Sequence, residues 1–142
     1  MNNLLTTDFG AFVSRVSLGL VLLMHSAYLK LMVFTLPGTA AFFGSIGLPE
    51  FSAYIVFSIE VVAGIALILG VKTRVFSALV IPVLAGATWA HSGSGWLFTN
   101  TGGGWEYPLF LTAMAFVQMC LGDGKFALSA RFLGFKPELQ QA

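Results

Sequence analysis

The sequence predicts an all-α integral membrane protein, a four-helix bundle with both termini in the cytoplasm. Its residues are 57% hydrophobic and only 9% charged, whereas a soluble globular domain carries roughly 25% charged residues. Four apolar stretches long enough for membrane helices follow one another, at about residues 9–34, 51–70, 75–91 and 106–121. We therefore expect a single transmembrane domain over residues 1–142.

Composition also excludes several function classes. The formal net charge is only +1, and without a basic stripe to meet phosphates we expect no nucleic-acid partner. Cys120 is the single cysteine, which excludes an internal disulfide and a redox-active cysteine pair. The N-terminal segment lacks a basic region and a small-residue cleavage site, so we expect no signal peptide.

The second apolar stretch carries the most informative residue of the chain. Residues 51–70 are apolar or small except for one carboxylate, Glu60, at the middle. A carboxylate near the midplane of a bilayer is energetically expensive, so such residues face the interior of a bundle and usually find a partner. The sequence therefore predicts that Glu60 is either paired or part of a binding site.

The first stretch supplies the candidate partners. At about 100° per residue, Arg15, His25 and Lys30 share one side of the helix. His25 lies close to the level of Glu60, whereas Lys30 lies near the outer mouth, level with His91 and Glu106. We expect the long side chain of Arg15 to reach Glu60 and form the buried pair.

The connecting segments set the orientation. Residues 35–50 and 92–105 contain no Lys or Arg, and the Pro and Gly residues within 35–50 leave either a short interfacial helix or an ordered loop open. The basic residues outside the spans all fall on the opposite side: Lys72, Arg74, Lys125, Arg131 and Lys136. The positive-inside rule then places both termini in the cytoplasm.

The polar residues within the spans are compatible with a quinone-like ring ligand. Together they could form a polar column through the bundle, with Glu60 and His25 as the catalytic, proton-carrying groups. Arg15 and Lys30 are the candidate cofactor-binding residues inside the bundle, and Trp105 with Glu106 forms a candidate outer entrance. No spacing typical of a metal site is present, so we expect neither a metal nor a covalently bound cofactor.

A purely structural role is the alternative for the same charges. Buried ion pairs can fix the register of two helices without binding any substrate. Lys30 is close enough to the interface for its ammonium group to reach the head groups, and His91, at the end of a span, fits an interfacial position.

Several short motifs occur together in an order that resembles the DoxX family of small bacterial membrane proteins. The resemblance covers about residues 14–129. It is carried by R-x3-G at Arg15, the segment from His25 to Leu31, G-L-P at 47–49, Glu60 with A-G-I-A-L-I-L-G at 63–70, T-R at 73–74, G-G-G-W-E-Y-P at 102–108 and G-D-G at 122–124.

The resemblance implies four helices in the plasma membrane and a link to redox complexes. Relatives are similar to small subunits of thiosulfate:quinone oxidoreductase and of an archaeal terminal quinol oxidase, or to components of quinone and oxidative-stress defence. Many members read H-G-x-x-K, whereas here Ser26 replaces the glycine and one extra residue separates His25 from Lys30. On an α-helix that residue turns Lys30 by about 100° away from its expected place.

The sequence is thus interpreted as an inner-membrane component of a quinone-linked redox system. Its expected partners are the lipid bilayer, a membrane or peripheral redox protein and a second copy of the chain. Two rival hypotheses remain: a non-catalytic assembly subunit of a membrane complex, and a small transporter of protons or a solute.

Overall fold

The computed structural model describes residues 6–124 and 126–128. These residues form helices and loops, and the prediction of an all-α fold is confirmed for them. The elements in chain order are α1 (Thr7–Leu23), η1 (Met24–Val33), α2 (Leu36–Ser45), α3 (Ser52–Leu69), α4 (Thr73–Ala90), η2 (Ser92–Ser94) and α5 (Glu106–Leu121). The predicted positions of Lys125, Arg131 and Lys136 lie outside the described residues.

Within the part of the chain that the structure describes, three helices are long and apolar enough to cross a membrane. α1 and η1 form one continuous helix of 27 residues, in which an 18-residue window has a mean hydropathy of 1.7, while α3 and α4 have 18 residues each, with values of 2.2 and 1.4. α5 is apolar but has only 16 residues, short of the roughly 20 that span the hydrocarbon core. The chain is a membrane protein, and a fourth crossing by α5 stays a prediction.

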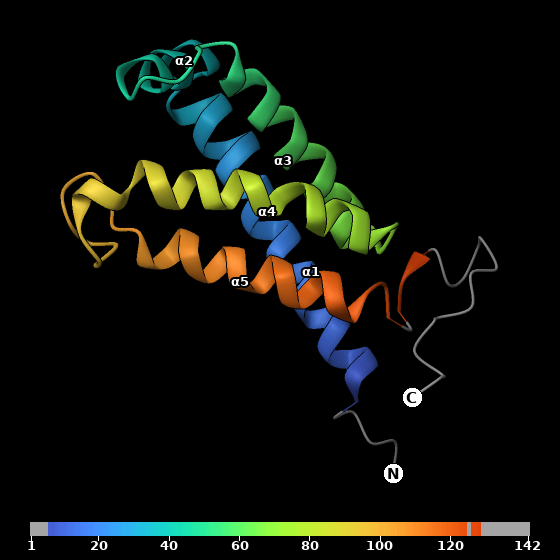
Figure 1. The fold of residues 1–142 in the computed structure, drawn as a ribbon. Helices are drawn as coiled ribbons and strands as arrows, with labels where there is room; N and C mark the ends of the chain where they lie inside the picture. Colours follow the sequence, from blue (N-terminus) through green and yellow to red (C-terminus); the bar gives the residue numbers. More distant parts are fainter. Residues whose placement is uncertain (1–5, 125, 129–142) are drawn as a thin grey trace.

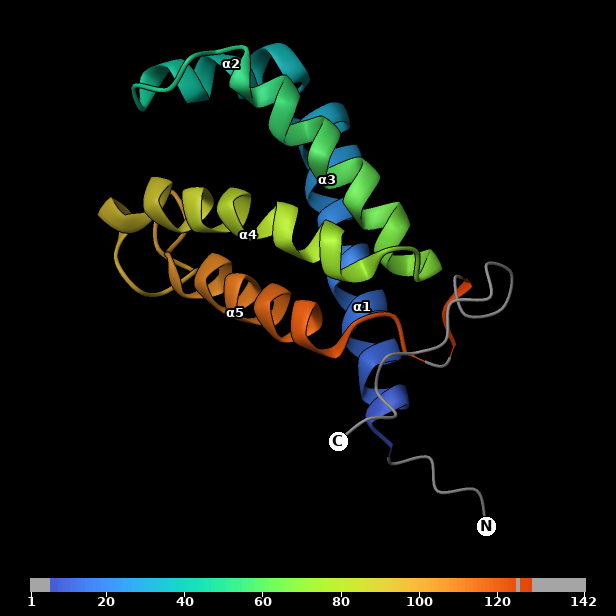
Figure 2. The same cartoon turned by 45° about the vertical axis from the view of Figure 1, so that its right-hand side comes forward.

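The long helices form two pairs. The continuous helix α1–η1 lies against α3, and α4 lies against α5 (Figure 1). The second pair crosses the first, because α4 also packs on α3 and α5 also packs on α1. Figure 1 and Figure 2 both show the two pairs together near the α3–α4 turn and apart toward α2 and the loop after α4.

The apolar core lies where the two pairs cross. Every one of the four helices contributes two residues to it: Leu18, Leu22, Ala63, Leu67, Val80, Leu84, Leu111 and Ala115. These side chains are all at most 7% exposed, so the crossing is closed by apolar contact, and the polar groups lie on either side of it.

Short elements close the ends of the pairs. Residues 35–50, for which the sequence allowed either a short helix or a loop, contain α2, which is capped by the side chain of Thr35 and has Pro37 as its second residue. At the other end, α3 stops at Gly70, which adopts the left-handed conformation with a φ of 71°. Asp123 Oδ1 then accepts hydrogen bonds from the backbone N–H and the hydroxyl of Thr73, at 2.8 and 2.6 Å, and so caps the start of α4 from beyond α5.

Two glycines let α1 approach α3 closely. A Cβ on Gly19 would lie 2.7 Å from the carbonyl oxygen of Gly64, and a Cβ on Gly64 would lie 2.9 Å from Leu23 Cγ. Small residues at such a crossing bring two backbones together and increase their dispersion contact. This contact sets the distance between the two helices that carry the polar site described below.

We expect Gly19→Ala to lower the free energy of unfolding by about 1–3 kcal/mol, the usual cost of overpacking. The matched control is Gly86→Ala in α4, where a Cβ would meet nothing within 4 Å and the better helix propensity of Ala makes the change neutral or stabilising. Unfolding in detergent, followed by circular dichroism, measures both. Equal midpoints for the two variants would show that the close approach at Gly19 is not required.

Candidate functional site

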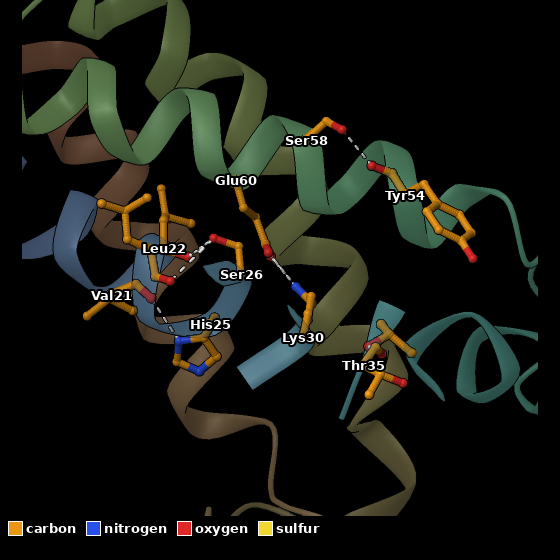
Figure 3. A network of polar contacts seen from close by, with 11 residues as sticks. Val21, Leu22, His25, Ser26, Lys30, Thr35, Tyr54, Ser58 and Glu60 are labelled. Atoms are coloured by element: carbon orange, nitrogen blue, oxygen red, sulfur yellow. Dashed lines mark hydrogen bonds and ion pairs between the residues drawn. The ribbon is translucent and has the colours of Figure 1, made fainter. Parts of the chain in front are cut away.

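Glu60 is paired with Lys30. The Lys30 ammonium group donates to both carboxylate oxygens of Glu60, at 2.6 and 2.5 Å (Figure 3). The side chains are 6% exposed for Glu60 and 18% exposed for Lys30. The pair therefore joins η1 to α3 within two membrane helices, in surroundings that give an ion no water to compensate for lost hydration.

A π-helix brings Lys30 into this position. η1 covers Met24–Val33, and at its end the N–H of Phe34 donates to the carbonyl of Leu29, five residues earlier, at 2.8 Å. Five residues turn a side chain about 140° from its starting direction on an α-helix, and the wider turns of i→i+5 bonding reduce this angle. The π-helix therefore absorbs part of the extra residue between His25 and Lys30 and turns Lys30 back toward the side that carries His25.

Polar side chains satisfy the backbone where α1 becomes η1. Ser26, which is fully buried, donates its hydroxyl to the carbonyl of Leu22 at 2.7 Å. His25 Nδ1 lies 2.9 Å from the carbonyl oxygen of Val21. Figure 3 shows both groups pointing back to the preceding turn, beside the Lys30–Glu60 pair. Hydrogen bonds of this kind replace backbone bonds that a change of helix type disturbs.

His25 also contacts the second helix pair. Its ring stacks on that of Tyr107, at the start of α5, with a centroid separation of 5.9 Å and an interplanar angle of 28°. The backbone bond and the ring contact together restrict both the position and the rotation of the imidazole. The polar group around Glu60 thus extends across η1 to α5, and Tyr107 is a member of it that the sequence did not single out.

The predicted Arg15–Glu60 pair is wrong. Arg15 Nη1 donates to the carbonyls of Leu67 and Ile68 at 3.0 and 2.6 Å, and Nη2 donates to that of Phe126 at 2.7 Å. The guanidinium carbon also lies 5.1 Å from the centre of the Phe12 ring. The carbonyls at the end of α3 carry the negative end of the helix dipole, and each carbonyl oxygen has two lone pairs, so they attract the cation that the sequence assigned to Glu60.

A pocket of about 480 Å³ lies at the start of α5. Glu106 Oε1 accepts the backbone N–H of Phe98 at 2.9 Å, which holds the preceding loop over the helix. Trp105 packs edge-on against Trp96 at 4.6 Å beside this contact. The lining residues are Trp96, Phe98, Glu106, Tyr107, Leu109, Phe110 and Ala113. Of the predicted outer entrance, Glu106 lines this pocket and Trp105 lies beside it, whereas the sequence did not single out Trp96 or Phe98.

The polar groups do not form one continuous column. Arg15 is bonded to the carbonyls at the end of α3, the Lys30–Glu60 pair joins η1 to α3, and Glu106 is bonded within the outer segment. His91 Nδ1 lies 3.0 Å from the carbonyl of Gly102, within the same loop. Among the described residues no hydrogen bond or ion pair links these groups, so the predicted column is wrong as a connected network.

Comparison with known proteins places this arrangement in a family. The DoxX family model matches residues 10–93. The chain belongs to the DoxX family. The matched region contains His25, Lys30 and Glu60, and it ends before α5.

One curated relative is the Bacillus subtilis (strain 168) protein named "Putative oxidoreductase CatD". It is 37% identical to this DoxX-family chain over 81 residues, which cover 56% of this chain and 58% of the relative. The chain therefore matches a little over half of the length of that protein. No match to a solved structure was found.

We expect Lys30→Met and Glu60→Leu each to cost about 3–5 kcal/mol of stability, because each leaves one buried charge without its partner. The double variant Lys30→Met/Glu60→Leu removes both charges, so it should lose less stability than either single variant. Denaturation in detergent completes this double-mutant cycle. Additive losses would contradict an energetic coupling between the two side chains.

We expect Arg15→Lys to cost about 1.5–3 kcal/mol, because one ammonium group cannot bond three carbonyls on two segments as a guanidinium does. The matched control is Lys72→Arg, an exchange at an exposed basic residue near the same end, which should stay within about 0.5 kcal/mol. The same denaturation measurement compares them. An unchanged midpoint for Arg15→Lys would show that a single positive charge is sufficient there.

Proposed function

We propose that this protein is a component of a quinone-linked redox system in the bacterial inner membrane. In this proposal it binds a quinone-like ring in the membrane and passes it to, or receives it from, a partner protein that holds the redox centre. The observation that carries the proposal is the Lys30–Glu60 pair, with His25 beside it, placed between two apolar helices. Ionisable groups at such a depth are costly and mark functional sites more often than not.

The chemistry of the pair fits a ring with oxygen substituents. Lys30 has three N–H donors, of which Glu60 accepts two. The remaining N–H can donate to a ring oxygen, and the Glu60 carboxylate can take or return a proton when the ligand changes its protonation state. Arg15 is left out of this site, because its guanidinium is occupied by three carbonyl oxygens near the end of α3.

The pocket at the start of α5 is the proposed entrance. It is lined mainly by aromatic and aliphatic side chains, and Tyr107 both lines it and stacks on His25. Trp105 and Glu106 hold the loop that forms its rim. An apolar ligand could pass from the lipid along this surface toward His25 and Lys30, with its tail left among the apolar residues.

We further propose that α5 crosses the membrane as a fourth span, with both termini in the cytoplasm. Support comes from the apolar sequence of α5, from its packing along α4, and from the absence of Lys and Arg in residues 35–50 and 92–105. The relative named as an oxidoreductase supports the redox assignment through its similarity to this chain.

A non-catalytic assembly subunit is the second candidate. It is favoured by the observation that Lys30 and Glu60 neutralise each other and that Arg15 is bonded to backbone carbonyls. Both contacts hold helices together without a ligand. The two functions differ in what should be found with the purified protein: a bound quinone in the first case, and a stoichiometric protein partner without quinone in the second.

We expect the purified protein to carry a quinone that mass spectrometry detects after mild detergent extraction, and to bind added decylubiquinone. In the Lys30→Met/Glu60→Leu variant, whose fold the double-mutant cycle tests, affinity should fall about tenfold or more, since a charge-assisted hydrogen bond is worth about 1.5–3 kcal/mol.

The matched control for quinone binding is Tyr54→Phe, an exposed position on α3, which should bind like the wild type. Wild-type protein that neither carries nor binds a quinone would overturn the proposal. A partner protein recovered in place of the quinone would establish the assembly role.

A further inference from the structure

His25 is held in one tautomer by its backbone contact. Its Nδ1 lies 2.9 Å from the carbonyl oxygen of Val21, and a carbonyl oxygen can only accept a hydrogen bond. Nδ1 therefore carries the hydrogen and donates it. In the neutral ring the other nitrogen, Nε2, then has a lone pair and can act only as an acceptor.

Nε2 is an acceptor without a partner in the described part of the chain. The only hydrogen-bond contact of His25 there is the one to Val21. The ring is half-buried and stacked on Tyr107 at 5.9 Å, so it cannot swing freely toward another group. An acceptor at this depth in a membrane protein has little water to bond to and gains from any ligand that brings a donor.

Lys30, on the same helix η1, supplies a hydrogen-bond donor, whereas His25 supplies an acceptor. Two of its three N–H groups are used by the Glu60 oxygens, which leaves one donor available. Lys30 follows His25 on the next turn of the same π-helix (Figure 3), so a ring that lies along η1 can meet the acceptor of His25 and the donor of Lys30 together. A ligand that satisfies both must donate one hydrogen bond and accept another.

The two oxidation states of a quinone differ in whether their ring oxygens can donate a hydrogen bond. The oxygens of the oxidised form are carbonyls, which accept from Lys30 but have no hydrogen to give to His25. The oxygens of the reduced form are hydroxyl groups, which both donate and accept. We propose, building on the proposed function, that the site binds the reduced hydroquinone in preference to the quinone, with His25 Nε2 accepting a hydrogen bond from a ring hydroxyl group.

A ligand series tests the preference without altering the protein. The probes are trimethylhydroquinone, its oxidised quinone and its dimethyl ether, titrated under anaerobic conditions into wild-type protein in lipid nanodiscs. The hydroquinone should bind about tenfold tighter than either of the others, because one hydrogen bond together with the relief of an unpaired acceptor contributes about 1.4 kcal/mol. The dimethyl ether keeps the ring and its substituents but has no donor.

Two variants assign the effect to His25. His25→Phe keeps a flat ring for the stack on Tyr107 but removes both nitrogens, and it should bind the hydroquinone, quinone and dimethyl ether with affinities within about twofold of one another. The control is His91→Phe, which replaces the other histidine, also bonded through Nδ1 to a backbone carbonyl, and which should keep the tenfold preference.

The outcomes separate this inference from the function on which it rests. Tighter binding of the hydroquinone that disappears in His25→Phe supports both. Equal wild-type affinities for the hydroquinone and the quinone, or tight binding of the dimethyl ether, would overturn the preference and leave quinone binding intact. Binding of none of the three probes would overturn both. A preference unchanged in His25→Phe would overturn the role of His25.

Discussion

The ion pair between Lys30 and Glu60 is the interaction on which the rest of this structure depends. Both charges lie within membrane helices, and neither can recover in lipid the hydration it lost. The ion pair is therefore stable only where the spacing and rotation of η1 and α3 bring the two charged groups into direct contact. The glycine contact between α1 and α3 sets the spacing of these helices, and the π-helix sets the rotation of Lys30.

The π-helix has both a structural and a chemical consequence. It absorbs part of the rotation that one extra residue between His25 and Lys30 would cause, and it leaves Lys30 directed at Glu60. At the junction with α1, the side chains of Ser26 and His25 add hydrogen bonds to the carbonyls of Leu22 and Val21. The bond from His25 to Val21 also fixes the histidine tautomer, so the change of helix type and the protonation of the ring nitrogens are linked.

The buried polar groups lie at two separate levels along the helices, one on each side of the apolar core. At the α3–α4 end, Arg15 bonds both to the end of α3 and to the segment after α5, which holds the two pairs together, and Asp123 bonds to the start of α4. The apolar core at the crossing separates this end from the Lys30–Glu60 site. Toward α2 and the α4–α5 loop the two pairs diverge (Figure 2), and Tyr107 with His25 bridges them there. A ligand site between pairs is thus compatible with a tightly packed opposite end.

The sequence by itself determined the helical membrane class, the approximate bounds of the long helices and the need of Glu60 for a partner, because these follow from hydropathy, helix length and the cost of burying a charge. The partner of Glu60 was decided only by the tertiary structure. Residue depth is coarse, and long side chains of Arg and Lys reach over a turn or more, so sequence alone favoured Arg15. The bonding of Arg15 to carbonyls, the π-helix and the stack of His25 on Tyr107 all depend on how backbones approach one another, which no side-chain pattern specifies.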